Sequence, residues 1–390
     1  MNLEDFAERV RPLKAEGAYA VLARAKALEA QGRSIIHLEI GQPDFPTPEH
    51  IAEAGIQAIR AGRTRYTPPA GTADLRAAIA EVAGKWRGMT FSPEEVIVGP
   101  GAKPAIYFAA LALVEPGEEV IIPDPGFPSY SAIVRLAGGV PVPVRLDPDE
   151  LYNFDMQDFR QKISHRTKLV IMNSPSNPTG GVTPLHVLEQ IAAEVQRVGA
   201  WVISDEIYCQ LVYEGGAPSI AALPGMRERT IIVDGFSKTY SMTGWRLGFG
   251  IMPPALAERV GLLATHTIGC TADFTQAAGV AALRGDFSTV EAMRESFRQR
   301  RDLTVAALNT LPGVRCAMPK GAFYVFPDVR SYGRSSRELA DYLLEEAGVA
   351  LLAGSDFGPG GEGFLRISYA TAWEQIREGI ERMRQALARL

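Results

Sequence analysis

Cysteine and histidine are scarce in this chain of 390 residues, and neither forms a metal-binding pattern. The three cysteines, Cys209, Cys270 and Cys316, lack paired spacing, so they predict neither a disulfide framework nor a zinc site. The five histidines are scattered singly, and a surface or packing role explains each of them better than metal ligation. We therefore expect no metal site.

Long apolar runs and an excess of positive charge are also missing. No apolar run approaches the length that spans a bilayer, and Glu4 and Asp5 stand where a signal peptide would carry positive charge. The net charge of −5 leaves no basic surface for nucleic acid. With 46% hydrophobic and 22% charged residues, the composition is typical of a soluble globular protein. We expect it in the cytoplasm, bound to neither membrane nor nucleic acid.

Strand and helix patterns alternate from Glu95 to about Met252. Short β-branched runs end in loops rich in glycine, proline or polar residues, and helical segments separate them. Because βαβ crossovers bury such strands on both faces, the alternation predicts a mainly parallel, doubly wound sheet covered by helices. The fold class that we expect is α/β.

The two ends of the chain differ from this alternating part. Residues from about Asp5 to Gln31 have helical spacing, and from about Thr289 onward a charged helix, an amphipathic helix and a strand give an α+β pattern. We therefore expect a large domain over residues 48–287 and a smaller α+β domain over 288–390. The N-terminal segment, 1–47, is expected to pack with the small domain.

A single lysine stands in a loop rich in glycine and hydroxyl groups, directly after the predicted strand 231–233. This is Lys238, with Ser237 before it and Arg246 eight positions on. A solvated surface cation is the ordinary explanation of a lysine. Partial desolvation at a strand end would instead lower its pKa, as an amine that forms a Schiff base requires. Since Ser237 and Arg246 would suit a phosphate group, the combination suggests pyridoxal phosphate.

The same loops partly match two nucleotide-binding motifs, and neither motif fits. A P-loop requires glycine directly before its lysine, where this chain has Ser237. The turn at residues 99–103 lacks the third glycine of a dinucleotide fingerprint. This turn does join a strand to a helix, a geometry that directs backbone N–H groups at an anion such as phosphate.

Other candidate residues follow the ends of predicted strands or lie within one. A carboxylate such as Asp205 is costly at the end of an apolar strand unless it is paired, for example with a protonated pyridine nitrogen. Phe127, on a stiff loop, either fills the core or stacks on a planar ligand. Gly41 either makes a turn or lets a ligand approach the backbone. Arg366 is either tolerated on a half-exposed strand or binds a carboxylate.

Several motifs together resemble the class I/II aminotransferases, which are fold-type I pyridoxal phosphate enzymes. The resemblance rests on Tyr66-Thr67-Pro68, Gly101-Ala102-Lys103, Asn177-Pro178-Thr179-Gly180, Ser204-Asp205-Glu206-Ile207-Tyr208, Ser237-Lys238, Gly244-Trp245-Arg246-Leu247-Gly248 and Arg366. The resemblance covers nearly the whole chain, and the motifs follow one another in the same order as in the family. It is strongest with the prokaryotic aspartate aminotransferase branch. It implies ping-pong transfer of an amino group from an aspartate-like, neutral or aromatic L-amino acid to a 2-oxo acid such as 2-oxoglutarate.

The resemblance also implies the catalytic residues and the residues that contact the cofactor ring. Lys238 would form the internal aldimine and then move the substrate proton, while Asp205 would keep the pyridine nitrogen protonated. Asn177 and Tyr208 would hydrogen-bond the ring hydroxyl, and Phe127 would stack on the ring.

The remaining implied contacts concern the cofactor phosphate and the substrate. The cofactor-binding set includes Gly101, Ala102, Lys103, Ser237 and Arg246, with Tyr66 reaching in from the second subunit of a homodimer. Arg366 would bind the substrate α-carboxylate, helped by Asn177 and Gly41.

The reaction and the donor stay open at the level of sequence. A β-lyase, decarboxylase or racemase would use the same fold, because the cofactor supplies most of the chemistry; a cofactor-binding regulator is disfavoured by the acidic composition. A dicarboxylate donor would need a second cation, for which Lys14, Arg24 and Lys103 are candidates. A neutral or aromatic side chain would equally suit the residues Tyr19, Phe45, Phe274 and Tyr324.

Overall fold

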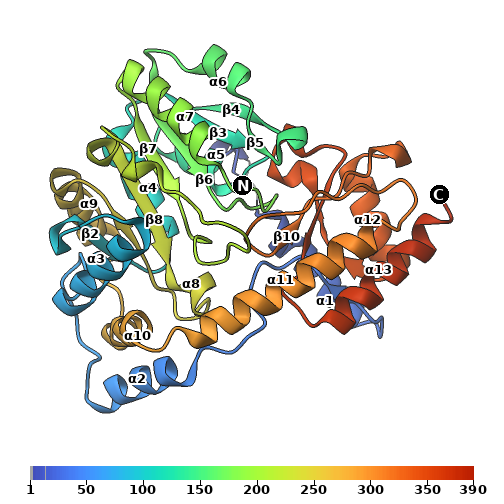
Figure 1. Cartoon of the computed structure of the whole chain (residues 1–390), viewed down its shortest axis with the longest axis horizontal. Helices are drawn as coiled ribbons and strands as arrows, with labels where there is room; N and C mark the ends of the chain where they lie inside the picture. Colours follow the sequence, from blue (N-terminus) through green and yellow to red (C-terminus); the bar gives the residue numbers. More distant parts are fainter. Residues whose placement is uncertain (1–2, 14) are drawn as a thin grey trace.

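The computed structural model describes residues 3–13 and 15–390, and an eight-stranded sheet forms its centre (Figure 1). The strand order is β2-β9-β8-β7-β6-β3-β4-β5. The bounds are β2 (Val96–Gly99), β3 (Glu119–Asp124), β4 (Val140–Asp147), β5 (Asn153–Phe154), β6 (Thr167–Asn173), β7 (Trp201–Asp205), β8 (Thr230–Gly235) and β9 (Gly248–Ile251). The five strands β8, β7, β6, β3 and β4 run parallel to one another. At the two edges, β9 is antiparallel to both β8 and β2, and β5 is antiparallel to β4. The predicted mainly parallel sheet is therefore confirmed.

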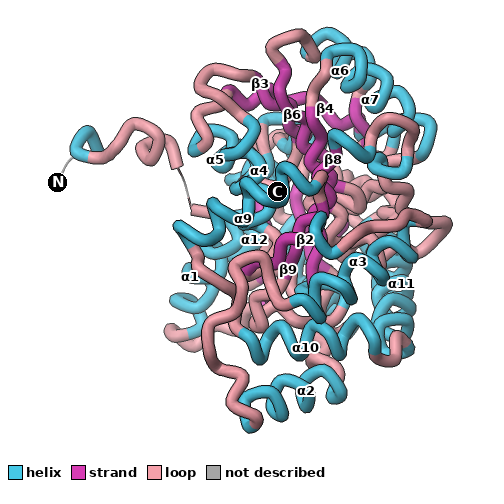
Figure 2. The backbone as a smooth tube through the Cα atoms, turned by 90° about the vertical axis from the view of Figure 1, so that its left-hand side faces the viewer, coloured by secondary structure: helices cyan, strands magenta, loops and turns pink. Residues whose placement is uncertain are grey.

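Helices cover both faces of this sheet because successive strand residues point to opposite sides. They are α3 (Ala73–Arg87), α4 (Lys103–Leu113), α5 (Ser129–Leu136), α6 (Met156–Lys162), α7 (Leu185–Val198), α9 (Pro254–Thr267) and α10 (Asp273–Arg284), whereas α2 (Glu49–Arg60) packs on α10. On β8, Ile232 belongs to a hydrophobic cluster with α3 and α10, whereas Ile231 and Val233 pack with α4 and α9. Figure 2 shows α2 beside α10 at one end of the molecule.

The segment that contains α1 and β1 packs with the C-terminal part of the chain on the other side of the molecule, at the right in Figure 1. A three-stranded antiparallel sheet contains β10 (Tyr324–Val325), β13 (Leu365–Ser368) and β12 (Leu352–Ala353), and β1 (Ile36–His37) pairs with β11 (Val349–Ala350). Around them lie α1 (Gly17–Glu29), α11 (Ser288–Leu308), α12 (Ser336–Ala347) and α13 (Trp373–Leu387). The pairing of β1 with β11 supports grouping residues 1–47 with 288–390; the boundaries 47/48 and 287/288 stay predictions.

Some predicted elements differ from the observed ones. The N-terminal helix begins at Gly17 rather than near Asp5, because Pro12 has no N–H to donate and restricts the residue before it. Figure 2 shows residues 3–13 lying apart from α1. The strand β4 was not predicted, since prolines at 141 and 143 interrupt its β-branched pattern. Within the described residues, every helix is too short or too polar to cross a bilayer.

Candidate active site

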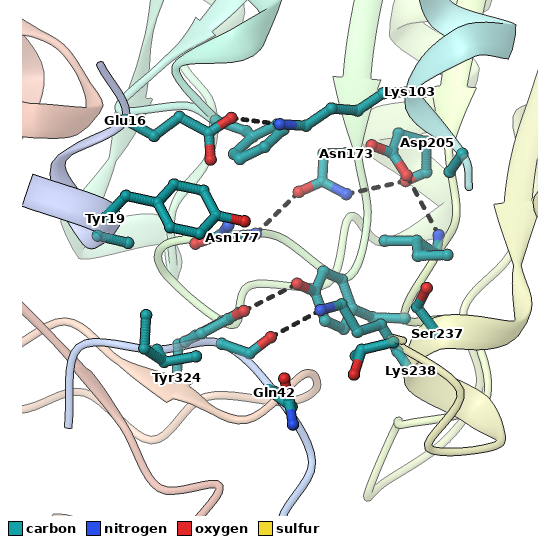
Figure 3. Close-up of a pocket in the computed structure, with 18 of the residues that line it drawn as sticks. Glu16, Tyr19, Gln42, Lys103, Asn173, Asn177, Asp205, Ser237, Lys238 and Tyr324 are labelled. Carbon is teal, nitrogen blue, oxygen red and sulfur yellow. Dashed lines mark hydrogen bonds and ion pairs between the residues drawn. The ribbon is translucent and has the colours of Figure 1, made fainter. Parts of the chain in front are cut away.

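A cavity of about 720 Å³ lies where the carboxyl ends of the parallel strands face the N-terminal segment (Figure 3). Most of the predicted site residues line it: Gly41, Ala102, Lys103, Phe127, Asn177, Asp205, Tyr208, Ser237, Lys238, Arg246 and Arg366. Two others do not contribute to its lining. Gly101 packs directly against the Arg246 guanidinium. Tyr66 lies on the loop between α2 and α3 and is 98% exposed. The role of Tyr66 in a second subunit therefore stays a prediction.

Lys238 lies on α8 (Phe236–Thr239), the single helical turn that directly follows β8. Its Nζ donates a hydrogen bond of 2.6 Å to the Gly41 carbonyl oxygen, so the amine is held at the cavity edge formed by the N-terminal segment. Burial, together with the positive charges of Arg366 and Arg246, lowers the pKa of Lys238 to about 8. An amine with this pKa is more nucleophilic near neutral pH than a solvated lysine.

Asp205 lies at the end of β7 and is 6% exposed. Its Oδ2 accepts a 2.7 Å hydrogen bond from the Tyr130 hydroxyl, and the Ile207 N–H donates to Oδ1 at 3.3 Å. Burial raises the pKa of Asp205 to about 6, and the negative charges of Asp234 and Glu206 add to the effect. The carboxylate is therefore ionised at neutral pH, at an energetic cost that a cationic partner would offset.

A buried ion network supports Asp205 and Lys238 from behind. Arg87, at the end of α3, donates from Nε to Glu206 Oε2 at 2.6 Å and from Nη2 to Asp234 Oδ2 at 2.7 Å. All three side chains are at most 6% exposed. Glu206 follows Asp205 directly, and Asp234 stands four residues before Lys238. The guanidinium thus joins the ends of the two strands that carry the central site residues.

Tyr208 connects the end of the large sheet with Tyr324 of the small one, and Arg366 packs against the same tyrosine. The Tyr208 hydroxyl lies 2.9 Å from the Tyr324 hydroxyl on β10, and the Arg366 guanidinium stacks 4.6 Å from the centre of the Tyr324 ring. Arg366 also donates from Nη2 to the Glu39 carbonyl oxygen. All four residues of β13 are buried, so the explanation of Arg366 as a cation on a half-exposed strand is wrong.

Two buried polar atoms of the cavity residues have no hydrogen-bond partner among the described residues: Asn177 Oδ1 and Arg366 Nε. Leaving such an atom without a partner costs about 1–3 kcal/mol, and more for a charged group. Since both residues line the cavity, a polar ligand would supply the missing partners. Because the lining contains both a guanidinium, on Arg366, and a carboxylate, on Asp205, it favours a ligand that carries charges of both signs.

The turn before α4 offers a place for an anion. The first N–H groups of a helix have no partner within the helix and carry its positive dipole end. Gly101 N–H already donates to the Gly99 carbonyl at 2.8 Å, so the donors available for an anion are those of the residues that follow. Arg246 approaches this turn, with Nη2 donating to the Pro100 carbonyl at 3.2 Å. A Cβ atom on Gly248 would overlap the backbone of Gly101 and Ala102, which explains glycine at that position.

Sequence reasoning missed several residues that line the cavity or support it. Asn173 ends β6 as Asp205 ends β7, so the rule that located Asp205 would have found it, whereas Tyr130 lies in the first turn of α5. Glu16 lines the cavity from the start of α1, and its sequence context gave no such signal. Of the proposed side-chain contacts, Tyr19 and Tyr324 line the cavity, whereas Phe45 packs on Phe297.

Of the three cations that the sequence offered for a second substrate carboxylate, only Lys103 is found among the described residues of the cavity lining. Arg24 forms ion pairs with Asp341 and Glu345 on α12, away from the cavity lining, and Lys14 lies outside the described residues. Lys103 lines the cavity and pairs with Glu16. Across residues 3–13 and 15–390, no group of three or more His, Cys, Asp or Glu side chains could hold a metal ion.

Comparison with known proteins gives matches over nearly the full chain. Residues 33–383 match the family described as aminotransferase class I and II. The aspartate aminotransferase of Pyrococcus horikoshii is 39% identical over 386 residues, which cover 98% of this chain and 97% of that protein. The aromatic-amino-acid aminotransferase 2 of Thermococcus litoralis is 39% identical over 392 residues, covering 99% and 98%. The structure of an alanine aminotransferase from Pyrococcus furiosus superposes with a TM-score of 0.94 at 32% identity, covering 99% of this chain and all of that one.

Proposed function

Because this chain belongs to the class I and II aminotransferases, we propose that the cavity is its active site and that Lys238 carries the cofactor there. The enzyme transfers an amino group from an amino acid to a 2-oxo acid, and its family implies pyridoxal phosphate as the cofactor. The observation that carries the proposal is the Lys238 amine, whose pKa is lowered to about 8 by burial and by two neighbouring guanidinium groups.

The residues of the cavity fit pyridoxal phosphate. Asn177 has a buried amide oxygen without a partner among the described residues, and the buried Asp205 carboxylate accepts hydrogen bonds from Tyr130 and Ile207 but forms no ion pair with a described residue. Ser237, Arg246 and the first turn of α4 supply donors for a phosphate group. These groups match the ring hydroxyl, the pyridine nitrogen and the phosphate of the cofactor in chemical type.

The cofactor, when bound, supplies an electron-poor ring that accepts the electron pair left when the substrate Cα–H bond breaks. Lys238 Nζ would act as the base that takes the proton from the substrate Cα and later gives it back. Asp205 holds a proton on the pyridine nitrogen by its negative charge, and the Tyr130 hydroxyl fixes the orientation of that carboxylate.

Arg366 binds the substrate α-carboxylate. Its guanidinium is 3% exposed, its Nε has no partner among the described residues, and its position is fixed by the Glu39 carbonyl and the Tyr324 ring. A planar guanidinium matches a carboxylate bidentately. Asn177 and the Gly41 segment lie on the same cavity and assist in orienting the substrate.

The enzyme acts as a homodimer in which Tyr66 of each subunit reaches the site of the other. The support for this is the exposure of Tyr66, at 98%, and of Ile56 and Ile59 on the adjacent α2, at 42% and 51%. Exposed apolar side chains gathered in one segment are typical of interfaces. Sedimentation of the purified protein tests the dimer. The cytoplasmic location stays a prediction from the sequence.

The test is a pair of lysine variants. Lys238→Ala is expected to abolish transamination and the visible absorption band of protein-bound cofactor. The control Lys85→Ala removes an exposed lysine of α3 that does not line the cavity. It is expected to leave the transamination rate and the visible band unchanged. Retention of turnover and of the visible band by Lys238→Ala would contradict the proposal.

A further inference from the structure

One ion pair, between Glu16 and Lys103, lies in the lining of the cavity. Glu16, the residue that precedes α1, accepts hydrogen bonds at Oε1 from Lys103 Nζ and, at 2.8 Å, from Ser129 Oγ. Glu16 and Lys103 both line the cavity, and Figure 3 shows the pair at one side of the other site residues. The contact joins residues 87 positions apart, so the fold creates it.

The resemblance places Lys103 in the cofactor-binding set, but its ammonium group has no role in the function proposed above. The described lining contains four cationic side chains, Lys103, Lys238, Arg246 and Arg366. The last three serve the cofactor and the α-carboxylate in the proposal above. Lys103 is therefore the cation of this chain's described lining that is placed to bind a second carboxylate, on the side chain of an acidic substrate. In this enzyme Glu16 already neutralises that ammonium group.

The wall beside this pair is apolar and aromatic. Tyr19 and Leu22 of α1 and Ile40 after β1 line the same cavity, and Figure 3 shows the Tyr19 ring pointing across it toward Asn177. On the other side, the Lys103 ammonium lies 4.9 Å from the centre of the Phe127 ring. A neutral or aromatic side chain would contact this wall and leave the ion pair intact.

We propose that Glu16 makes this aminotransferase selective for substrates with neutral side chains, above all aromatic ones, by occupying Lys103. This rests on the proposed function of the cavity. A substrate side-chain carboxylate would have to displace Glu16 from Lys103 or lie beside it as a like charge, which disfavours binding. Glu16 is thus a specificity-determining residue.

The experiment compares two donors in the first half-reaction, because 2-oxoglutarate is itself a dicarboxylate and would confuse the full cycle. The holoenzyme is mixed with L-phenylalanine or L-aspartate, and the loss of the visible cofactor band gives kcat/KM for each donor. The wild-type enzyme should prefer phenylalanine. Glu16→Gln should raise the aspartate-to-phenylalanine ratio about fivefold or more, since it frees Lys103 and removes a like charge.

A second variant and a binding measurement separate charge from structure. Glu16→Gln combined with Lys103→Gln should lose the gain for aspartate, because no ammonium remains. Calorimetric titration of the holoenzymes with succinate and 3-phenylpropionate should show the same reversal without turnover. The control Glu81→Gln removes an exposed carboxylate of α3 and should leave the ratio at its wild-type value.

Wild-type preference for aspartate over phenylalanine would overturn the inference, as would an unchanged ratio in Glu16→Gln. Either result leaves transamination itself established. Failure of the wild-type enzyme to convert any amino donor, in contrast, would overturn the proposed function of the cavity and the inference with it.

Discussion

Arg87 Nη2 lies 2.7 Å from Asp234 Oδ2, beneath the strand end that leads to Lys238. The same guanidinium reaches Glu206, which follows Asp205. Burial of two carboxylates without a cation would be strongly unfavourable, so Arg87 ties the strand ends together where the site residues emerge. The geometry of the site therefore depends on a helix that does not contact the cavity.

Replacement of Arg87 should destabilise the protein by more than the loss of the packing contacts that its own side chain makes. Arg87→Leu leaves Glu206 and Asp234 buried without their cation and should lower the free energy of unfolding by about 3–5 kcal/mol. Urea denaturation measures the change. Lys85→Leu, two positions earlier on the same helix and exposed, is the control and should cost well under 1 kcal/mol. Equal effects of the two substitutions would show that the network contributes little.

Gly248 should tolerate no side chain. A Cβ atom there would overlap the backbone of Gly101 and Ala102, forcing β9 away from the turn before α4. Gly248→Ala is expected to cost about 1–3 kcal/mol of stability and to weaken cofactor binding, measured by equilibrium dialysis. Gly216→Ala, where a Cβ would meet nothing within 4 Å, should change neither quantity. Unaltered cofactor affinity in Gly248→Ala would argue against a phosphate site at this turn.

Lys238 should give the cofactor-free protein a stability that rises with pH. Its folded-state pKa of about 8 lies below the usual value of 10.5, so the unfolded chain binds more protons between these values. The penalty is therefore complete below pH 8 and is relieved as the pH rises toward 10.5. Lys238→Met should be more stable than the wild type at pH 7 by about 2 kcal/mol, given about 1.4 kcal/mol per pKa unit and partial exposure of the side chain. Denaturation from pH 7 to 10.5 should show the two proteins converging; a constant difference would contradict the lowered pKa.

Asp205 should make cofactor binding depend on pH in the acid range. Its pKa of about 6 means that the carboxylate becomes neutral as the pH falls through this value, and its attraction for a protonated pyridine nitrogen is then lost. The dissociation constant of pyridoxal phosphate should rise below pH 6 in the wild type. In Asp205→Asn that dependence should disappear, and kcat should fall about a hundredfold or more. Wild-type turnover in this variant would exclude the proposed role.

The strand-end residues could be predicted from the sequence because their signals are local. Lys238, Asp205 and Asn177 each follow a short β-branched run, and parallel strands bring such ends to one edge of the sheet. The positions of Arg87 and Glu16 could not be predicted, since their partners are distant in sequence and the pairing arises only in the folded chain.

The errors have equally specific causes. Helical composition continued through Pro12 and so placed the N-terminal helix too early, whereas α1 begins at Gly17. Prolines at 141 and 143 concealed β4, where only burial against β3 and β5 decides the structure. Arg366 was judged compatible with a half-exposed strand because period-two alternation cannot show that both faces of β13 are covered.

Reduction of the holoenzyme with sodium borohydride, followed by peptide mass spectrometry, tests the central claim most directly. The reagent fixes the cofactor on the amine that holds it, so the modified residue is identified without reference to turnover. The account predicts a single pyridoxyl-phosphate adduct on the peptide that contains Lys238. An adduct on another lysine, or none in folded protein that has bound the cofactor, would contradict it.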